Sequence, residues 1–158
     1  MKKNKKKEKQ LIGWQEWVQL PELGIFAIKA KVDTGAKTSA LHALDITTFQ
    51  SDGQDFVSFT VVPLQRDRHV RLKCTAQLLG QKMVRSSTGE PEQRYAIRTP
   101  LVLANKVWDI DVTLTNREPL IFRMLLGREA LASHCVIDPD KRFILGRLSG
   151  LRVKDFYQ

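Results

Sequence analysis

The stretch Lys31-Val32-Asp33-Thr34-Gly35-Ala36-Lys37-Thr38-Ser39-Ala40-Leu41 decides how the rest of the chain is interpreted. An apolar run rich in strand-forming residues, 25–32, leads directly to Asp33. Thr34 and Gly35 follow at once, so we expect the carboxylate to lie at a tight turn. Gly35 would allow backbone angles closed to other residues and the close approach of a ligand. The Thr34 hydroxyl would bond to neighbouring backbone groups and stiffen the turn.

A carboxylate in this position does little alone as a peptide-bond hydrolase. Two carboxylates about 3 Å apart share one proton, so that one form activates water while the other protonates the carbonyl or the leaving amine. Asp-Thr-Gly occurs once in the chain, and Asp-Ser-Gly does not occur. Ser51-Asp52-Gly53 has the wrong order and predicts a turn. If Asp33 hydrolyses peptide bonds, the second carboxylate must come from another copy of the chain. Taken alone, Asp33 is better explained as an Asx turn that caps a strand end and carries no chemistry.

The charge of the chain is unevenly placed. The 158 residues suit one domain with a sizeable core, and the net charge is +9. Residues 1–10 hold six lysines against Glu8, so more than half of the net charge lies there. We expect residues 1–10 to form a disordered basic tail and residues 11–158 to form the folded domain.

Three features favour the cytoplasm. Residues 11–20 include three polar or charged side chains and no small-residue cleavage site, which argues against a signal peptide. No stretch approaches the ~20 apolar residues that cross a bilayer, so we expect no membrane association. Cys74 and Cys135 give no disulfide framework, and two lone thiols suit a reducing compartment.

The pattern of the remaining chain is typical of an all-β protein. Residues 70–79 alternate most clearly between apolar and polar, as in a half-buried strand. Residues 83–97 predict a hairpin with a polar tip, and only residues 128–133 predict a helix. Many short strands separated by Gly, Pro and Asp turns predict a closed or sandwiched β structure. The other predicted strands are 12–20, 25–32, 41–49, 56–62, 101–103, 107–115 and 120–126.

A second motif accompanies the Asp33 loop. In Met124-Leu125-Leu126-Gly127-Arg128-Glu129-Ala130-Leu131, an apolar strand runs into Gly-Arg and a short helix. With the intervening hairpin, this order resembles the retroviral-type aspartic peptidases. There an Asp-Thr-Gly-Ala loop supplies the catalytic carboxylate, a hairpin flap covers the substrate, and the Gly-Arg segment supports the site. The hairpin tip, Ser-Ser-Thr-Gly, and Glu129 depart from the viral pattern.

A closer resemblance covers residues 13–151. It is to the bacterial retropepsin-like family that is associated with RimK-type ATP-grasp ligases and often labelled "ATP-dependent zinc protease". The resemblance implies a retropepsin-like acid-protease β-barrel with one short helix near the C-terminus. It rests on Glu16-Trp17-Val18, Leu20-Pro21, Lys29-Ala30-Lys31-Val32-Asp33-Thr34-Gly35-Ala36, Thr38-Ser39-Ala40-Leu41-His42-Ala43, Met124-Leu125-Leu126-Gly127-Arg128 and Val136-Ile137-Asp138-Pro139.

The resemblance also implies roles for single residues. The enzyme would be a homodimer in which Asp33 of each copy forms the catalytic dyad. Thr34 would brace the paired loops across the axis, and Gly35 would offer its backbone to the substrate. Arg128 would pair with a carboxylate at the edge of the site. Ala36 and Gly127 would complete the support, and no cofactor is implied.

An acidic substrate is expected on two grounds. In the family, the partner ligase adds glutamates to the C-terminus of a ribosomal protein, and the peptidase is linked to processing that protein. Independently, guanidinium groups bind carboxylates through paired hydrogen bonds. The sequence places Arg85, Arg94, Arg98 and Lys82 in and beside the hairpin, and Lys37 after the catalytic loop. We expect Lys37, Arg85 and Arg94 to bind an acidic peptide, although charges on an exposed hairpin are often only solvated.

Two other functions stay open. The family label suggests a zinc-dependent peptidase, but His-Glu-x-x-His is absent and no candidate pair has the spacing of a metal site, so we expect no metal. The chain also lacks a phosphate-binding glycine-rich loop, so ATP dependence would belong to a partner ligase. A non-catalytic module that binds RNA, the ribosome or a partner through the basic tail needs no dyad. The candidate zinc ligands are His42, His69, Cys74, His134 and Cys135.

Overall fold

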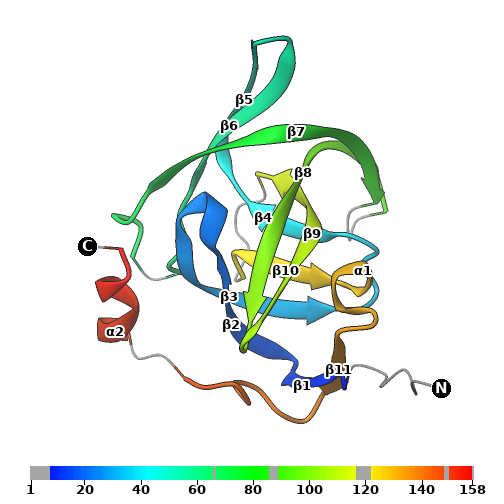
Figure 1. Cartoon of the computed structure of the whole chain (residues 1–158), viewed down its shortest axis with the longest axis vertical. Helices are drawn as coiled ribbons and strands as arrows, with labels where there is room; N and C mark the ends of the chain where they lie inside the picture. The colour runs from blue at the N-terminus through cyan, green and yellow to red at the C-terminus, as the bar shows by residue number, and fades with distance from the viewer. Residues whose placement is uncertain (1–7, 66, 86–88, 117–121, 148–149, 158) are drawn as a thin grey trace, which may run out of the picture.

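The computed structural model describes residues 8–65, 67–85, 89–116, 122–147 and 150–157 (Figure 1). They form eleven β-strands and two short α-helices, which confirms the predicted all-β class. Much of the predicted basic tail lies outside the described residues. The elements are β1 (Gln10–Gly13), β2 (Gln15–Leu20), a 3₁₀-helix η1 (Pro21–Leu23), β3 (Ile25–Asp33), β4 (Ser39–His42), β5 (Leu44–Ser51), β6 (Gln54–Val61), β7 (Leu72–Arg85), β8 (Pro91–Leu103), β9 (Lys106–Thr115), β10 (Met124–Gly127), α1 (Arg128–Leu131), β11 (Cys135–Asp138) and α2 (Gly150–Asp155).

The main sheet closes on itself. Its nine strands follow the order β2-β3-β10-β4-β9-β8-β7-β6-β5. β2 also pairs with β8 through Gln19 and Val102, so the strands from β2 to β8 in this order form a barrel. Alternating apolar residues of these strands fill its interior, as the predicted strand periodicity requires. Fully buried examples are Ile28, Leu41, Ile97, Leu101, Met124 and Leu126.

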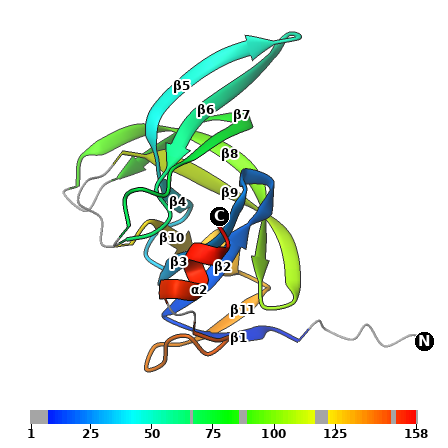
Figure 2. The same cartoon turned by 90° about the vertical axis from the view of Figure 1, so that its left-hand side faces the viewer.

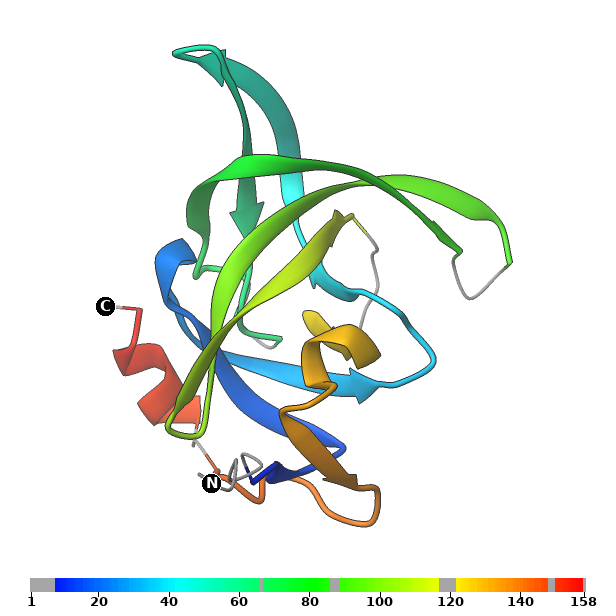
Figure 3. The ribbon, with the colours of Figure 1, turned by 45° about the vertical axis from the view of Figure 1, so that its right-hand side comes forward.

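Two hairpins leave the barrel. The β5–β6 hairpin projects away from it, as Figure 2 shows, and carries the stacked pair Phe49 and Phe56. The longer β7–β8 hairpin arches over the side where α1 and the end of β3 lie (Figure 3). The predicted hairpin is therefore present, but its strands are long because β7 and β8 also belong to the main sheet.

Strand β10 lies between β3 and β4. It runs parallel to β3, with Gly127 opposite Asp33, and antiparallel to β4, with Leu125 opposite Ala40. The chain from β3 to β4 must therefore cross the end of β10. A Cβ atom on Gly127 would lie 2.6 Å from the carbonyl carbon of Thr38 and 2.8 Å from its oxygen. Only glycine leaves room for this crossing.

The predicted strand 41–49 is two strands. β4 pairs with β9, whereas β5 pairs with β6, and the chain turns between them at Ala43, whose N–H donates to the Thr115 carbonyl. Asp45 takes a positive φ of 52°, and the β5–β6 register shifts between Leu44 and Thr47. Apolar alternation continues through such a bend, which is why the sequence does not reveal it.

A buried carboxylate fastens the C-terminal segment to the barrel. Glu16, fully buried, accepts hydrogen bonds from the N–H groups of Gly13 (2.7 Å), Ile144 (3.0 Å) and Leu145 (3.1 Å). Charge-assisted bonds of this kind offset the cost of burying a carboxylate. The segment after β11 therefore packs along the start of β2 without being a strand itself.

Helix α2 was not predicted. Its Val153 packs with Ala27 and Leu64 on the outer side of β3, and the Tyr157 hydroxyl bonds to the backbone N–H and carbonyl of Ala27. Burial raises the pKa of Tyr157 to about 12. Among the described residues, no helix is long and apolar enough to cross a membrane.

Glu16→Gln is expected to lower the free energy of unfolding by about 2 kcal/mol, because an amide NH₂ would face a backbone N–H donor. Urea denaturation followed by tryptophan fluorescence measures the change, with the exposed Glu22→Gln as the matched control. Equal midpoints for the two variants would contradict the role given to Glu16.

Gly127→Ala is expected to cost about 3 kcal/mol of stability, because the new methyl group would meet backbone atoms of Thr38 that cannot turn aside. The same urea titration tests this. A midpoint equal to that of the wild type would show that the loop can move away from β10 at no cost.

Candidate functional site

The Asp33 carboxylate lies at the last residue of β3, where the strand gives way to the loop 34–38. Asp33 is half-buried, and Thr34 and Gly35 are exposed. Gly35 does not take a positive φ, contrary to the expectation that it supplies unusual backbone angles. A Cβ atom on it would lie 3.3 Å from Asp33 Oδ1, so its lack of a side chain keeps the space beside the carboxylate open.

Backbone hydrogen bonds fix the loop to the start of α1. The N–H of Arg128 donates to the Ala36 carbonyl (2.9 Å), and that of Glu129 donates to the Lys37 carbonyl (3.2 Å). The Arg128 guanidinium donates to the Gly35 carbonyl (3.2 Å). Arg128 thus contacts the loop through a carbonyl group, whereas the family resemblance implied a carboxylate partner.

Sequence reasoning missed Ser39 as a support of the site. Its buried hydroxyl accepts a hydrogen bond from the Gly127 N–H (3.0 Å), and its carbonyl accepts one from the Thr113 hydroxyl (3.2 Å). Ser39 therefore joins β4, β9 and β10 directly behind the loop. The sequence shows only a serine beside a short apolar segment. Serine in such a place more often caps a helix or forms a turn, so the pattern did not indicate a role in supporting the site.

A groove of about 630 Å³ separates the loop from the β7 arm of the hairpin. Loop residues 35–38 form one wall, residues 82–85 of β7 form the other, and Arg128 and Glu129 close one end. Met83, on the hairpin side, is 70% exposed. The groove reaches Gly35 but is not lined by Asp33 itself, so the carboxylate lies next to it.

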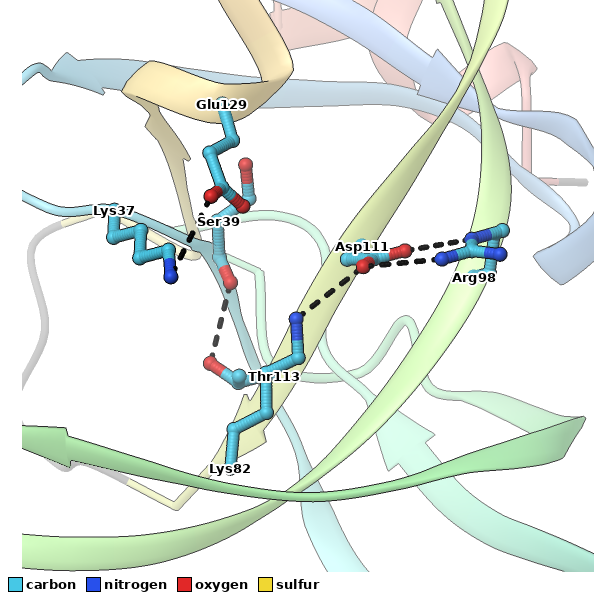
Figure 4. A network of polar contacts seen from close by, with 7 residues as sticks. All are labelled: Lys37, Ser39, Lys82, Arg98, Asp111, Thr113 and Glu129. Carbon is cyan, nitrogen blue, oxygen red and sulfur yellow. Dashed lines mark hydrogen bonds and ion pairs between the residues drawn. The ribbon is translucent and has the colours of Figure 1, made fainter.

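The groove carries several positive charges, some of them paired. Lys37 forms an ion pair with Glu129 at 3.7 Å, as Figure 4 shows. Lys82 and Arg98 converge on Asp111 at 3.3 and 2.8 Å (Figure 4). The Arg98 guanidinium, which donates to the carboxylate, holds the pKa of Asp111 below its usual value. Asp111 therefore stays ionised and partly neutralises Lys82.

The predicted substrate-binding residues are not all together. Lys37 and Arg85 line the groove. Arg94 is only 6% exposed, donates to Glu92 and lines a separate cavity of about 20 Å³ with His42 and Arg123. Arg85 and Arg94 are both close to the hairpin tip in the sequence, but the Arg94 side chain points toward the barrel. Proximity to the tip in the sequence therefore did not reveal that Arg94 lies outside the groove.

The candidate zinc ligands are spread over several parts of the fold, and only His134 and Cys135 are neighbours in the sequence. His42 is buried in β4, Cys74 is buried in β7, and His134 stacks on Trp108 with ring centres 4.2 Å apart. Burial raises the pKa of both Cys74 and Cys135 to about 11. Among the described residues, no three His, Cys, Asp or Glu side chains are grouped in a way that could hold a metal ion.

The chain is similar to curated proteins that are named as glutamate ligases. A "Probable alpha-L-glutamate ligase" of Desulfotalea psychrophila is 51% identical over 141 residues, covering 89% of this chain and 30% of that protein. A protein of the same name from Shewanella pealeana is 42% identical over 149 residues, covering 94% of this chain and 32% of that protein. The chain thus spans about a third of the length of these curated relatives.

A solved structure from Legionella pneumophila, of unknown function, matches with a TM-score of 0.73 and 27% identity. The match covers 87% of this chain and 99% of that one. Residues 11–147 match the RimB-like family model, described as "Retropepsin-like aspartic endopeptidase RimB". This match confirms the family predicted from the sequence motifs, and the chain belongs to the RimB-like family of retropepsin-like aspartic endopeptidases.

Proposed function

We propose that this chain is an aspartic-type peptidase that acts as a homodimer, with Asp33 of each copy in one catalytic pair. The carrying observation is the position of the Asp33 loop, fixed by its backbone beside a groove. Within the described residues, the Asp33 carboxylate makes no hydrogen bond or ion pair of its own. The hydrogen bonds of the loop backbone therefore support the position of Asp33 and leave its carboxylate oxygens available to water or substrate.

Chemistry would follow from proton sharing between the two carboxyl groups. The ionised carboxylate takes a proton from a water molecule as its oxygen attacks the scissile carbonyl, and the protonated partner gives its proton to the carbonyl oxygen. When the tetrahedral intermediate collapses, the C–N bond breaks and a proton passes to the leaving amine. No cofactor is needed for these steps.

The exposure of Thr34 supports a second copy at the loop. Its hydroxyl has no hydrogen-bond partner among the described residues of its own chain and is solvent-accessible. A two-fold axis beside the loop would bring Thr34 of one copy to the loop of the other, because an isologous interface places the same residues on both sides. The brace expected from the family resemblance would then form across the axis.

The substrate proposed is an acidic, glutamate-rich peptide. Lys37, Lys82, Arg85 and Arg128 line the groove against Glu129, so positive charge predominates even after ion pairing. Relatives of this chain carry the name glutamate ligase, and their additional length is compatible with a ligase part. We propose that the substrate is a glutamate tail, such as that of a ribosomal protein, and that an ATP-grasp ligase is the functional partner.

Asp33→Asn is expected to reduce hydrolysis of a glutamate-rich peptide by about 10³-fold, because an amide cannot accept the proton from water. Turnover is measured by mass spectrometry, and the exposed turn variant Asp52→Asn is the matched control. Hydrolysis retained in Asp33→Asn, or hydrolysis by a species that sedimentation shows to be monomeric, would reject the paired mechanism.

Arg85→Met is expected to raise KM about tenfold for a glutamate-rich peptide, with little change for a neutral one, because one charge-assisted contact is lost. Arg71→Met, exposed just before β7 and outside the groove, is the control for net charge. Equal effects of Arg85→Met on the two peptides would argue against charge recognition.

A further inference from the structure

Aromatic rings and positive charges gather where the segment 141–147 packs against β2. The Phe143 ring stacks on the Trp17 ring, with ring centres 6.5 Å apart and an interplanar angle of 24°. The guanidinium carbons of Arg142 and Arg147 lie 5.9 and 5.4 Å from the centre of the Phe143 ring. The Lys29 ammonium lies 5.5 Å from the centre of the Trp17 ring. We call these five residues the aromatic–cation cluster.

The backbone of the segment is fixed to the start of the barrel. The N–H of Phe143 donates to the Gln15 carbonyl at 2.9 Å, and the next two N–H groups donate to the buried Glu16 carboxylate. A Cβ atom on Gly13 would lie 2.3 Å from the carbonyl oxygen of Lys141, so the two chain segments are in close contact. The position of the Phe143 ring is therefore set by the fold, although the segment is not a strand.

The cluster continues along β3. Trp17 is opposite Lys29 in the register of β2 and β3, which puts both side chains on one face of the sheet. Side chains two residues apart point to the same side of a strand, so Lys31 lies on this face too. The Lys31 ammonium lies 5.6 Å from the centre of the Phe122 ring. All four contacts between a cation and a ring among the described residues thus lie in this part of the molecule.

Phe143 takes an unusual backbone conformation. Its φ is 53°, in the left-handed region that bulky side chains rarely adopt. The conformation costs on the order of 1 kcal/mol, and strained residues of this kind cluster at functional sites. The ring is only half-buried, and Arg142 and Arg147 are exposed. The fold therefore presents an aromatic ring at the surface, against the backbone preference of the residue that carries it.

The composition of the cluster favours one kind of anionic partner. An acidic peptide would use only the cations, because its carboxylates gain little from an aromatic ring. Single-stranded nucleic acid uses both, because its bases stack on rings and guanidinium planes while its phosphates accept hydrogen bonds from the cations. The acidic residues nearest to Arg142 in the sequence are Asp138 and Asp140, and the Asp138 carboxylate already accepts the N–H of Asp140 at 3.0 Å.

We propose that the aromatic–cation cluster is a binding site for single-stranded nucleic acid. Bases stack on its two rings, and phosphates bind its two arginines. Because Arg142 and Arg147 are exposed, their guanidinium groups turn outward to phosphates and leave the Phe143 ring to a base. The site uses neither Asp33 nor the groove beside its loop, so it is a further function that does not rest on the proposed peptidase activity.

The test measures binding of a fluorescein-labelled twelve-nucleotide RNA to the full chain by fluorescence anisotropy at several salt concentrations. The double variant Arg142→Met/Arg147→Met is expected to weaken binding about tenfold. It should also make the slope of log K against log salt concentration shallower by about 1.4, since each phosphate contact to a single strand contributes about 0.7.

Phe143→Leu is expected to weaken binding about tenfold without changing the salt slope, because stacking is lost and no charge is removed. Leucine meets the same backbone constraint as phenylalanine at this position. Phe143→Tyr, which keeps an aromatic ring, should bind the RNA like the wild type. A Phe143→Leu chain that also binds like the wild type would overturn the site, because the arginines alone would then form only a general anion surface.

Two controls match these variants. Arg71→Met/Lys73→Met removes two exposed charges at the start of β7, and Phe49→Leu removes an exposed ring from the β5–β6 hairpin. Each is expected to change the affinity less than about twofold, and losses equal to those of the cluster variants would overturn the site. Equal affinity for a duplex of the same sequence would also overturn it. So would displacement of the RNA by a polyglutamate peptide of equal charge at the concentration at which unlabelled RNA displaces it.

Discussion

The site depends on the threading of β10 between β3 and β4, because this threading forces the Asp33 loop to cross the end of a buried strand. Gly127 makes the crossing possible by leaving room for the backbone at Thr38. Once the loop lies there, hydrogen bonds from the backbone of Gly127, Arg128 and Glu129 reach Ser39, Ala36 and Lys37. Steric fit and hydrogen bonding thus act on the same few residues, and together they hold Asp33 at the strand end without using its carboxylate.

Polar groups inside the fold are arranged to join distant parts of the chain. Glu16 ties the segment at Ile144 and Leu145 to the start of the barrel, and the Tyr157 hydroxyl ties the C-terminus to Ala27 in β3. Each of these bonds spans more than 100 residues of sequence. The side of the barrel formed by β2 and β3 is therefore covered by the C-terminal helix α2, as Figure 1 shows.

Positive charge gathers in the groove beside the Asp33 loop. The groove is lined by Lys37, Lys82, Arg85 and Arg128. Acidic residues neutralise part of this charge, since Glu129 pairs with Lys37 and Asp111 pairs with Lys82. Surface ion pairs are weak, so an acidic ligand could compete for these cations.

The sequence by itself determined the all-β class, the hairpin, the Asp33 turn and the family, because strand alternation, turn residues and the two motifs are local patterns. Tertiary contacts decided three other features: the closure of the barrel through β2 and β8, the division of residues 41–49 into two strands, and helix α2. The same is true of single residues: Arg85 reaches the groove, whereas Arg94 is buried against Glu92. Spacing along a chain shows which residues are close in sequence. It does not show which face of a curved sheet each side chain occupies, or which helix packs on that face.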